Sequence, residues 1–335
     1  MSKIRLAMIG CGGNSSGHAR RLKRNPDVQI VAGCDVSKEI VEKYIDRNVP
    51  ELKPRPKSFD DLDEMLTKIK PDAVLISTPH TLHFEQGMKS LDAGCHVLME
   101  KPMVTAAEHA YMIADKVKET GKVFVIGYNT SCSANFYYLR EQIRNNSFGK
   151  LELVVGYITQ NWMRGTAGSW RQEPELSGGG QAYDSGAHLL NSLCWSVESN
   201  IDEVYAFLDN CGTKVDINSS INIRFENGVM ASIVVSGNCP SPGGTHMAFI
   251  FDGGRIEIDG WGGGWIRVFK GSEHIAEPPI TKEMSAGSPD DNFIGAILGR
   301  AEPRTSAVNG IIQSELMDAI YESAETGRPS RPKRR

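Results

Sequence analysis

The sequence predicts an α/β protein: an N-terminal Rossmann domain with a parallel sheet, then an α+β domain with a large, mostly antiparallel, open-faced sheet. Three observations carry this prediction. An apolar run over residues 4–9 ends in a glycine cluster, and a helical stretch follows. Up to about residue 127, apolar runs alternate with helical patterns, which is typical of βαβ units. From residue 151 onward, segments of alternating apolar and polar residues dominate, as in antiparallel strands.

The glycine cluster reads G-C-G-G-N-S over residues 10–15. Gly10 allows a tight turn, Gly12 lets a pyrophosphate approach the backbone, and the following helix offers free N–H groups and a positive dipole end. Ser15 replaces the third glycine of the usual fingerprint, and serine is small enough to keep the helix close to the strand. An ordinary glycine-rich turn is the alternative. We expect the dinucleotide to bind at Gly10, Gly12, Gly13, Asn14 and Ser15.

A second buried strand over residues 28–34 is followed directly by Asp35. A carboxylate at this position accepts hydrogen bonds from the ribose hydroxyls of NAD and repels the 2′-phosphate of NADP. Lys38 is near enough to soften that preference, so NAD is expected and NADP is kept as the alternative. A helix N-cap is the alternative interpretation of Asp35.

Polar side chains follow three further predicted strands, at residues 73–76, 96–99 and 123–126. Because ligands of parallel sheets bind at the carboxyl ends of the strands, these positions are expected to line the cofactor. The residues concerned are Thr78, Pro79, His83, Glu100, Lys101 and Asn129. A solvent-facing helix position is the alternative for His83, and a surface ion pair with Glu100 is the alternative for Lys101.

A second group of candidate residues lies between two predicted strands further along the chain. The glycines at 178–180 are expected to form a flexible loop that a ligand can approach, and a helix is expected to begin near Tyr183. Asp184 and His188 are four residues apart and would share a face of that helix, where a carboxylate orients an imidazole. A solvated i,i+4 pair is the alternative. Arg171 is a natural partner for an anion.

The ordered set of these motifs resembles the Gfo/Idh/MocA oxidoreductase family, the relatives of glucose–fructose oxidoreductase and inositol dehydrogenase. The resemblance covers nearly the whole chain. It rests on I-G-C-G-G at 9–13, Asp35, S-T-P-H-T-L-H at 77–83, E-K-P at 100–102, W-R at 170–171 and, after the three glycines, D-S-G-A-H at 184–188. The chain departs from the family pattern at Ser15, and at Asn191, where relatives often carry an acid one turn after the histidine.

The resemblance implies NAD(P)-dependent oxidation of a sugar or cyclitol hydroxyl, or the reverse reaction. It places the family's lysine at Lys101 and its aspartate–histidine pair at Asp184 and His188. In that assignment His188 is the general base, Asp184 orients it or binds a second hydroxyl, and Lys101 stabilises the developing alkoxide. Lys101 as the base is the alternative. The resemblance also implies homo-oligomers, dimers or tetramers, that form through the C-terminal sheet.

Other residues are expected around this centre. Trp170 and Arg171 are expected on the cofactor side. Aromatic faces suit the C–H faces of a sugar ring, and plain packing is the alternative for each residue expected on the substrate side: Tyr128, Trp162, Arg164 and Tyr183. No metal site is expected, because His80 and His83 have no carboxylate at ligand spacing.

Composition and charge exclude several classes of protein. The chain has 335 residues, a net charge of −4 and seven scattered cysteines. The acidic balance argues against binding nucleic acid, and the cysteine pattern argues against a disulfide framework. The apolar runs fall short of the ~20 residues of a membrane helix, and the run near the start is too short for a signal peptide, so a cytoplasmic location is expected.

We expect a dinucleotide-binding Rossmann domain over residues 1–127, a substrate-binding and oligomerisation domain over 128–327, and a frayed basic tail over 328–335. Two other functions use the same fold. A glycosidase or lyase that oxidises a sugar transiently and then returns the hydride would use the same residues. A non-catalytic NAD-binding sensor could lose Lys101 or the Asp184–His188 pair, and all three residues are present.

Overall fold

The structure is a computed structural model that describes residues 2–335. Its contacts divide the chain into two compact units. Unit 1 comprises the chain up to Val104 together with Glu108–Gly127 and Ser288–Ala307, and unit 2 comprises Thr105–Ala107, Tyr128–Gly287 and Val308–Arg335. A late segment of the sequence therefore returns to unit 1. The functional boundary between residues 127 and 128 stays a prediction.

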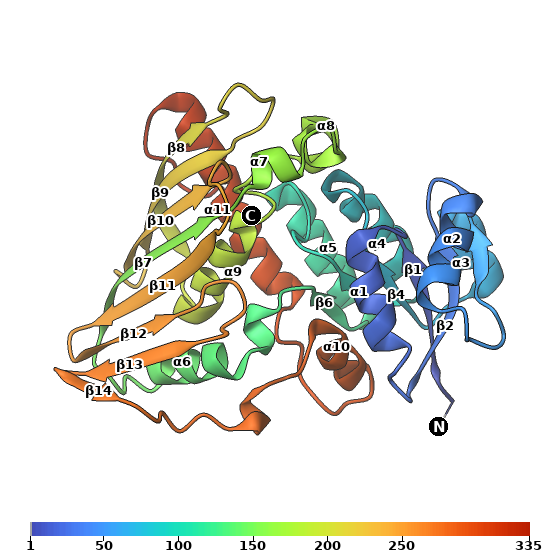
Figure 1. Ribbon diagram of the computed structural model, residues 1–335, viewed down its shortest axis with the longest axis horizontal. Helices are drawn as coiled ribbons and strands as arrows, with labels where there is room; N and C mark the ends of the chain where they lie inside the picture. Colours follow the sequence, from blue (N-terminus) through green and yellow to red (C-terminus); the bar gives the residue numbers. More distant parts are fainter. Residues whose placement is uncertain (1) are drawn as a thin grey trace. The chain divides into compact units, whose positions relative to one another are not determined.

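Unit 1 contains a six-stranded sheet in which neighbouring strands are parallel (Figure 1). The strand order is β3-β2-β1-β4-β5-β6, so the order reverses between β1 and β4, where open α/β sheets bind their ligands. The sequence patterns miss β3 because three residues are too few to show an alternation. The strands are β1 (Ile4–Ile9), β2 (Val28–Cys34), β3 (Lys57–Phe59), β4 (Ala73–Ile76), β5 (His96–Met99) and β6 (Phe124–Ile126).

Helices of unit 1 pack against this sheet through their apolar sides. Leu22, Ile45 and Phe293, from three different helices, share a core with Leu6 and Met8 of β1. A helix also approaches β5 very closely, because a Cβ on Gly87 would lie 2.7 Å from the Met99 side chain. The helical segments are α1 (Gly13–Leu22), α2 (Lys38–Asn48), α3 (Leu62–Ile69), η1 (His80–Leu82), α4 (His83–Asp92), α5 (Ala107–Thr120) and α10 (Pro289–Ile297).

Unit 2 contains an eight-stranded sheet in the order β14-β13-β12-β11-β7-β10-β9-β8. β7 and β10 pair in parallel and the other neighbouring pairs are antiparallel, which confirms the predicted mostly antiparallel sheet. The strands are β7 (Leu151–Thr159), β8 (Ile201–Asp209), β9 (Asn218–Phe225), β10 (Met230–Ser236), β11 (Gly244–Phe251), β12 (Gly254–Ile258), β13 (Ile266–Lys270) and β14 (Glu273–Ile275).

One face of the second sheet is covered by α6 (Ala134–Arg144), α9 (Gly186–Val197) and α11 (Ala307–Thr326) (Figure 1). Every residue of α9 is buried, so it is a core helix rather than an amphipathic surface helix. None of the helices formed by residues 2–335 combines the length and apolar character needed to cross a bilayer. The shorter helical segments are η2 (Thr130–Cys132), α7 (Trp162–Gly165), η3 (Trp170–Gln172), α8 (Pro174–Ser177) and η4 (Lys282–Met284).

The opposite face of the second sheet is open. Buried and exposed residues alternate along β7 and β9, as period-two strands with one covered face require. Large apolar side chains stand on the open face, among them Tyr157 and Met230, which are 44% and 51% exposed. The predicted open-faced sheet is thus confirmed.

The expectation of a frayed basic tail is wrong. Ser330 exchanges two backbone hydrogen bonds with Val204 of β8, both at 2.8 Å. Arg334 donates to the carbonyl oxygen of Ile201 and to the Glu226 carboxylate. Because β8 ends the sheet and would otherwise present unpaired backbone groups, the tail covers an edge that is liable to pair with other chains.

Candidate functional site

The glycine turn joins β1 to α1 at the point where the strand order of the first sheet reverses. Gly10 has a φ of +87°, and a Cβ there would lie 2.5 Å from the carbonyl oxygen of Ser77. By contrast, apart from adjacent residues and the helix's own backbone, no atom of residues 2–335 lies within 4 Å of a Cβ placed on Gly12 or Gly13. The first turn of α1 also carries no acidic residue. Open space beside free N–H groups at this helix N-terminus fits a pyrophosphate.

Asp35 lies beside this turn. Its Oδ2 accepts a hydrogen bond from the Cys11 N–H at 2.7 Å, and its Oδ1 accepts from the Val36 N–H at 2.7 Å. The N-cap of α2 is instead Ser37, whose side chain accepts from the Glu39 N–H at 3.2 Å. Asp35 is therefore not the N-cap of this helix, and its carboxylate is held where a ribose-binding acid is expected.

The Ser15 hydroxyl forms a hydrogen bond that a glycine could not make. The Tyr44 hydroxyl donates to the Ser15 carbonyl oxygen at 2.8 Å, so the Ser15 hydroxyl donates in turn to the Tyr44 oxygen at 2.7 Å. Both residues are buried, and burial raises the pKa of Tyr44. The departure from the third glycine thus ties α1 to α2. Asn14, in the first turn of α1, is exposed.

His83 joins the loops that follow β4 and β5. Its Nδ1 lies 2.8 Å from the carbonyl oxygen of Pro102, and its Nε2 lies 3.0 Å from that of Thr78. The ring is fully buried, and burial lowers its pKa, so the solvent-facing alternative is wrong. Lys101 lies in the loop that follows β5 and is only 8% exposed, so it is not an exposed surface lysine. Pro79 is half-buried and Asn129 is exposed, and their roles stay predictions.

A buried charge cluster that the sequence analysis missed centres on His18 of α1. Its Nε2 lies 2.7 Å from Glu100 and its Nδ1 lies 2.7 Å from Asp290, which also pairs with Arg21 at 2.5 Å. Burial disfavours the charged imidazolium, but the hydrogen bonds to Asp290 and Glu100 outweigh it and raise the pKa of His18 to about 9. The cluster fixes Glu100, whose Oε2 accepts from the Lys101 N–H at 3.3 Å.

In unit 2, the structure brings together four residues that the sequence analysis selected. Asp184 Oδ2 accepts a hydrogen bond from Trp162 Nε1 at 2.8 Å and from Arg171 Nε at 3.1 Å. The Arg171 guanidinium also lies 4.5 Å from the centre of the Trp170 ring. The helix begins at Gly186 rather than near Tyr183, so Asp184 stands in the turn before it.

His188 lies among aromatic rings and is 4% exposed. The Tyr128 ring meets it edge-on, with centroids 5.8 Å apart, and the Trp261 ring lies 4.2 Å away. The sequence analysis predicted Tyr128 near the substrate but did not identify Trp261. A tryptophan among four nearby glycines, at 260 and 262–264, is the signal that could have revealed it.

Asp259 holds the Trp261 loop in place. Its carboxylate accepts from the backbone N–H groups of Trp261, Gly262 and Gly264 at 3.2, 3.3 and 2.9 Å, and from the Thr245 hydroxyl. Burial alone would raise the pKa of Asp259, but these hydrogen bonds outweigh it and lower the pKa. The loop that carries Trp261 is therefore built around a charged carboxylate that accepts four hydrogen bonds from the protein.

The glycine run at 178–180 packs tightly within the protein, so the expected ligand-accessible loop is wrong. A Cβ on Gly180 would lie 1.9 Å from the Asp216 carbonyl oxygen, and one on Gly179 would lie 2.3 Å from the Tyr321 hydroxyl. Asp216 also accepts from the N–H groups of Gly180 and Ala182 at 2.7 and 2.8 Å, and from the Tyr321 hydroxyl. The glycines are needed for these close contacts.

Three remaining residues have structural surroundings. Tyr183 is buried with its ring 5.7 Å from that of Tyr321, and burial raises its pKa. Arg164 is exposed and donates to Asn161 and Asn238 at 3.3 and 3.1 Å. Asn191 donates to Gln313 at 3.0 Å, so it connects α9 to α11. A contact of Tyr183 or Arg164 with substrate stays a prediction.

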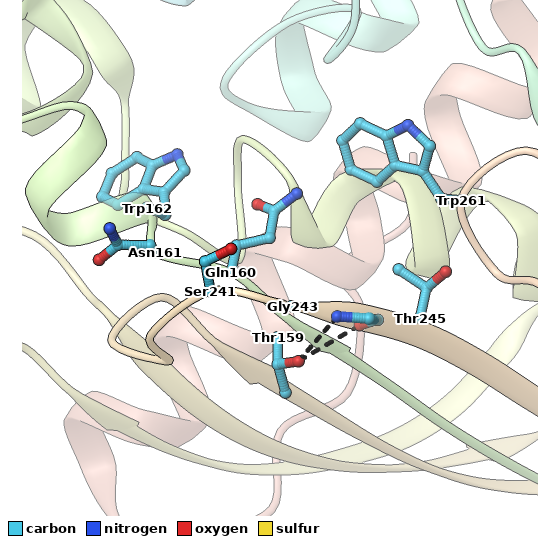
Figure 2. Close-up of a pocket in the computed structure, with 9 residues that line it drawn as sticks. Thr159, Gln160, Asn161, Trp162, Ser241, Gly243, Thr245 and Trp261 are labelled. Carbon is cyan, nitrogen blue, oxygen red and sulfur yellow. Dashed lines mark hydrogen bonds between the residues drawn. The ribbon is translucent and has the colours of Figure 1, made fainter.

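An open pocket of about 540 Å³ lies beside this centre. Figure 2 shows Trp162 and Trp261 at its opposite ends, with the Gln160 side chain between them. Small-molecule sites typically have volumes of about 300–1,000 Å³. The lining residues are Thr159, Gln160, Asn161, Trp162, Ser241, Gly243, Gly244, Thr245 and Trp261.

The Rossmann sheet, the open glycine turn and the placement of Asp35 indicate a dinucleotide-binding protein. Residues 4–128 match the oxidoreductase family with an NAD-binding Rossmann fold, and residues 136–264 match the GFO/IDH/MocA C-terminal domain. The chain belongs to the Gfo/Idh/MocA oxidoreductase family.

Individual relatives agree with this assignment. D-glucoside 3-dehydrogenase of Escherichia coli (strain K12) is 26% identical in an alignment that covers 97% of each chain. Glycosyl hydrolase family 109 protein 2 of Akkermansia muciniphila is 27% identical over 192 residues, covering 55% of this chain and 41% of that protein. The WlbA dehydrogenase from Bordetella pertussis, solved in complex with NADH and UDP-GlcNAcA, is 25% identical with a TM-score of 0.84, covering 99% of this chain and all of that one.

The His18 cluster predicts a pH-dependent stability. Because the folded pKa of about 9 lies above the ordinary value of 6.5, the stabilisation is fully present below pH 6.5 and is lost as pH rises through 9. We expect the free energy of unfolding to fall between pH 6.5 and 8.5, as part of a total effect on the order of 3 kcal/mol. Urea unfolding at successive pH values measures it.

The control for this experiment separates His18 from other groups. In His18→Gln, the free energy of unfolding should fall less between pH 6.5 and 8.5 than in the wild type. In His274→Gln, which replaces an exposed histidine, it should fall as in the wild type. Measurements stop at pH 8.5 because thiols of the unfolded chain ionise above it, while burial holds the pKa of folded Cys34 at about 11. A wild-type stability that does not change between pH 6.5 and 8.5 would contradict the prediction.

The packed glycine run gives a second prediction. Gly180→Ala should destabilise the protein by about 2–4 kcal/mol, because its Cβ cannot fit against the Asp216 backbone. Gly165→Ala is the matched control: no described atom lies within 4 Å of its Cβ position, so its stability should be unchanged or slightly higher. Chemical denaturation of the two variants tests this, and equal stabilities would show that the loop does not need Gly180.

Proposed function

We propose that this protein transfers a hydride between a sugar or cyclitol hydroxyl, or the corresponding ketone, and a nicotinamide. The observation that carries the proposal is the Asp184–His188 centre beside a neutral pocket, in a chain whose other unit has an NAD-binding Rossmann fold. The similarity to D-glucoside 3-dehydrogenase over 97% of both chains supports a sugar substrate. We propose NAD as the preferred dinucleotide over NADP because Asp35 would repel a 2′-phosphate.

The cofactor side of the proposal assigns roles to residues of unit 1. The α1 N-terminus at Gly12 and Gly13 would receive the pyrophosphate, and Asp35 would accept from the ribose hydroxyls. Thr78, Glu100 and the other residues after the strands would line the remainder. Trp170 and Arg171 of unit 2 are also proposed on the cofactor side. When bound, NAD supplies the hydride acceptor that no side chain can provide.

The chain's own residues handle the proton and the oxygen. We assign His188 as the general base that removes the hydroxyl proton, with the imidazole matched to near-neutral pH. Lys101 would donate a hydrogen bond to the same oxygen and stabilise its developing negative charge. Asp184 is fixed by Trp162 and Arg171, which suits it to bind a neighbouring hydroxyl or to orient His188. Lys101 as the base is the alternative assignment.

We also propose a homo-oligomer that forms through the open face of the second sheet. Val155, Tyr157, Met230 and Val234 stand on strands β7 and β10 and are each at least 42% exposed. Exposed apolar residues that adjoin one another on a sheet are a common association surface. Dimers and tetramers would both cover this face.

A second candidate function is a glycosidase that oxidises its sugar transiently and returns the hydride. The observation that favours it is the 27% identity to glycosyl hydrolase family 109 protein 2. It has less support than the dehydrogenase because the alignment covers 41% of that protein. It predicts release of a sugar without net accumulation of NADH.

The experiment follows absorbance at the reduced-nicotinamide band with purified protein, NAD or NADP, and a panel of glycosides, aldoses and inositols. We expect steady NADH growth with at least one polyol. Lys101→Ala and His188→Ala should each lower kcat/KM by about 10²–10⁴, the usual contribution of a group that handles a proton. Lys118→Ala and His274→Gln, at exposed positions, are the matched controls and should retain full activity.

The outcomes separate the candidates. Free sugar released from a glycoside, with NAD that stays bound and no net NADH, would favour the glycosidase. Full activity in both Lys101→Ala and His188→Ala would refute the site assignment. Tightly bound NAD without turnover of any compound would favour a sensor.

A further inference from the structure

The pocket between Trp162 and Trp261 adjoins both residues of the proposed catalytic pair without including them. The Trp162 indole N–H donates to Asp184 at 2.8 Å, and the Trp261 ring lies 4.2 Å from the His188 ring. Neither Asp184 nor His188 lines the pocket. A ligand bound at Asp184 and His188 would therefore lie next to this pocket, separated from it by the two indoles.

The pocket walls offer hydrogen-bonding groups that the protein leaves available. Gln160 Oε1 accepts from Gln181 Nε2 at 3.0 Å, and within residues 2–335 nothing accepts from Gln160 Nε2. The Ser241 hydroxyl likewise has no hydrogen-bond partner in the described chain. Thr245 donates its hydroxyl proton to Asp259, which leaves the oxygen as an acceptor. Figure 2 places these side chains along the space between the tryptophans.

None of the nine lining residues carries an ionisable side chain. The Asp259 carboxylate, which accepts four hydrogen bonds from its own loop and Thr245, places a negative charge beside the pocket. Arg164 does not line the pocket, and its guanidinium donates through Nη1 to the amide oxygens of Asn161 and Asn238. A phosphate or carboxylate held by the lining residues alone would gain no cationic donor.

The Trp261 indole offers the larger surface to a ligand, because Trp162 is only 6% exposed. Trp261 is 37% exposed although it lies against the buried His188, so its solvent-facing surface is available to a ligand. Indole faces favour flat apolar surfaces such as an aromatic ring or the C–H face of a sugar. Neutral donors and acceptors between two aromatic ends suit a second ring that is polar at its edge and uncharged.

We infer that this pocket is a subsite for the second ring of an uncharged glycoside, either an aromatic aglycone or a neighbouring sugar. The inference rests on the proposed function, because Asp184 and His188 are taken to hold the ring that is oxidised. It goes beyond that function by naming the substrate class: neutral glycosides of two rings, in preference to free hexoses and to sugar phosphates.

Calorimetric titration tests the subsite without turnover, using wild-type protein saturated with NADH. The ligands are methyl and phenyl glucosides and galactosides of both anomeric configurations, cellobiose, and glucose 6-phosphate. In the matching series, we expect the phenyl glycoside to bind at least about tenfold more tightly than the methyl glycoside, because only the phenyl ring reaches the indoles. Glucose 6-phosphate should bind more weakly than the methyl glycoside.

Gly244→Leu is the blocking variant, because its Cβ position is free of described atoms within 4 Å and the glycine lines the pocket. It should reduce the phenyl-to-methyl affinity ratio to about one. Trp265→Ala is the matched control: Trp265 is 38% exposed, like Trp261, but packs on His246 outside the pocket, so the ratio should be retained.

Equal affinities for phenyl and methyl glycosides, an unchanged ratio in Gly244→Leu, absence of binding by all the glycosides, or tightest binding of glucose 6-phosphate would each overturn the subsite. Turnover with NAD is measured separately on the same ligands. Preferential binding of the phenyl glycoside without any oxidation would refute the proposed dehydrogenase and leave the subsite standing. Oxidation without tighter binding of the phenyl glycoside would refute the subsite and leave the proposed dehydrogenase standing.

Discussion

The geometry of unit 2 depends on the buried carboxylate of Asp216. A carboxylate taken out of water is costly unless donors surround it, and here two backbone N–H groups and the Tyr321 hydroxyl do so. These donors come from the glycine-rich segment and from α11, while Asp216 itself precedes β9. The same interaction therefore sets where the chain turns before α9. Asp184 lies in that turn and His188 lies in the first turn of α9. The hydrogen bonds of Asp216 therefore determine the positions of both residues.

Two other carboxylate clusters work in the same way. Asp259 accepts hydrogen bonds from the loop that carries Trp261. Glu100, at the carboxyl end of β5, and Asp290 both pair with His18. Asp216 and Asp259 fix segments that have no regular secondary structure, whereas the His18 cluster joins α1 and α10 to the loop after β5. A loop held by one charge and many short contacts can place a side chain about as firmly as a helix does, provided that every donor is present.

Local sequence was sufficient for the features whose causes are local. The β1–α1 turn, the acid after β2 and the alternation of the second sheet each depend on neighbouring residues, and the sequence predicts them. It could not predict the His18 cluster, because Glu100 and Asp290 are 82 and 272 residues away. The glycines at 178–180 were misinterpreted because glycine permits both an open loop and a close contact, and only Asp216 and Tyr321 decide between them. The pattern of β8 is unclear in the sequence because the apolar Tyr205 and Phe207 lie on its less buried face, and the docked tail depends on that strand's edge.

The segment between β10 and β11, residues 237–243, has a consequence for how such a protein diversifies. It supplies pocket residues such as Ser241 and Gly243, whereas Asp184 and His188 are embedded in a core that tolerates little change. Surface connections accept insertions and substitutions far more readily than packed helices do. Under the proposed function, exchanging this connection alone would change the substrates that a descendant of the same gene accepts, while the proposed catalytic pair is inherited intact.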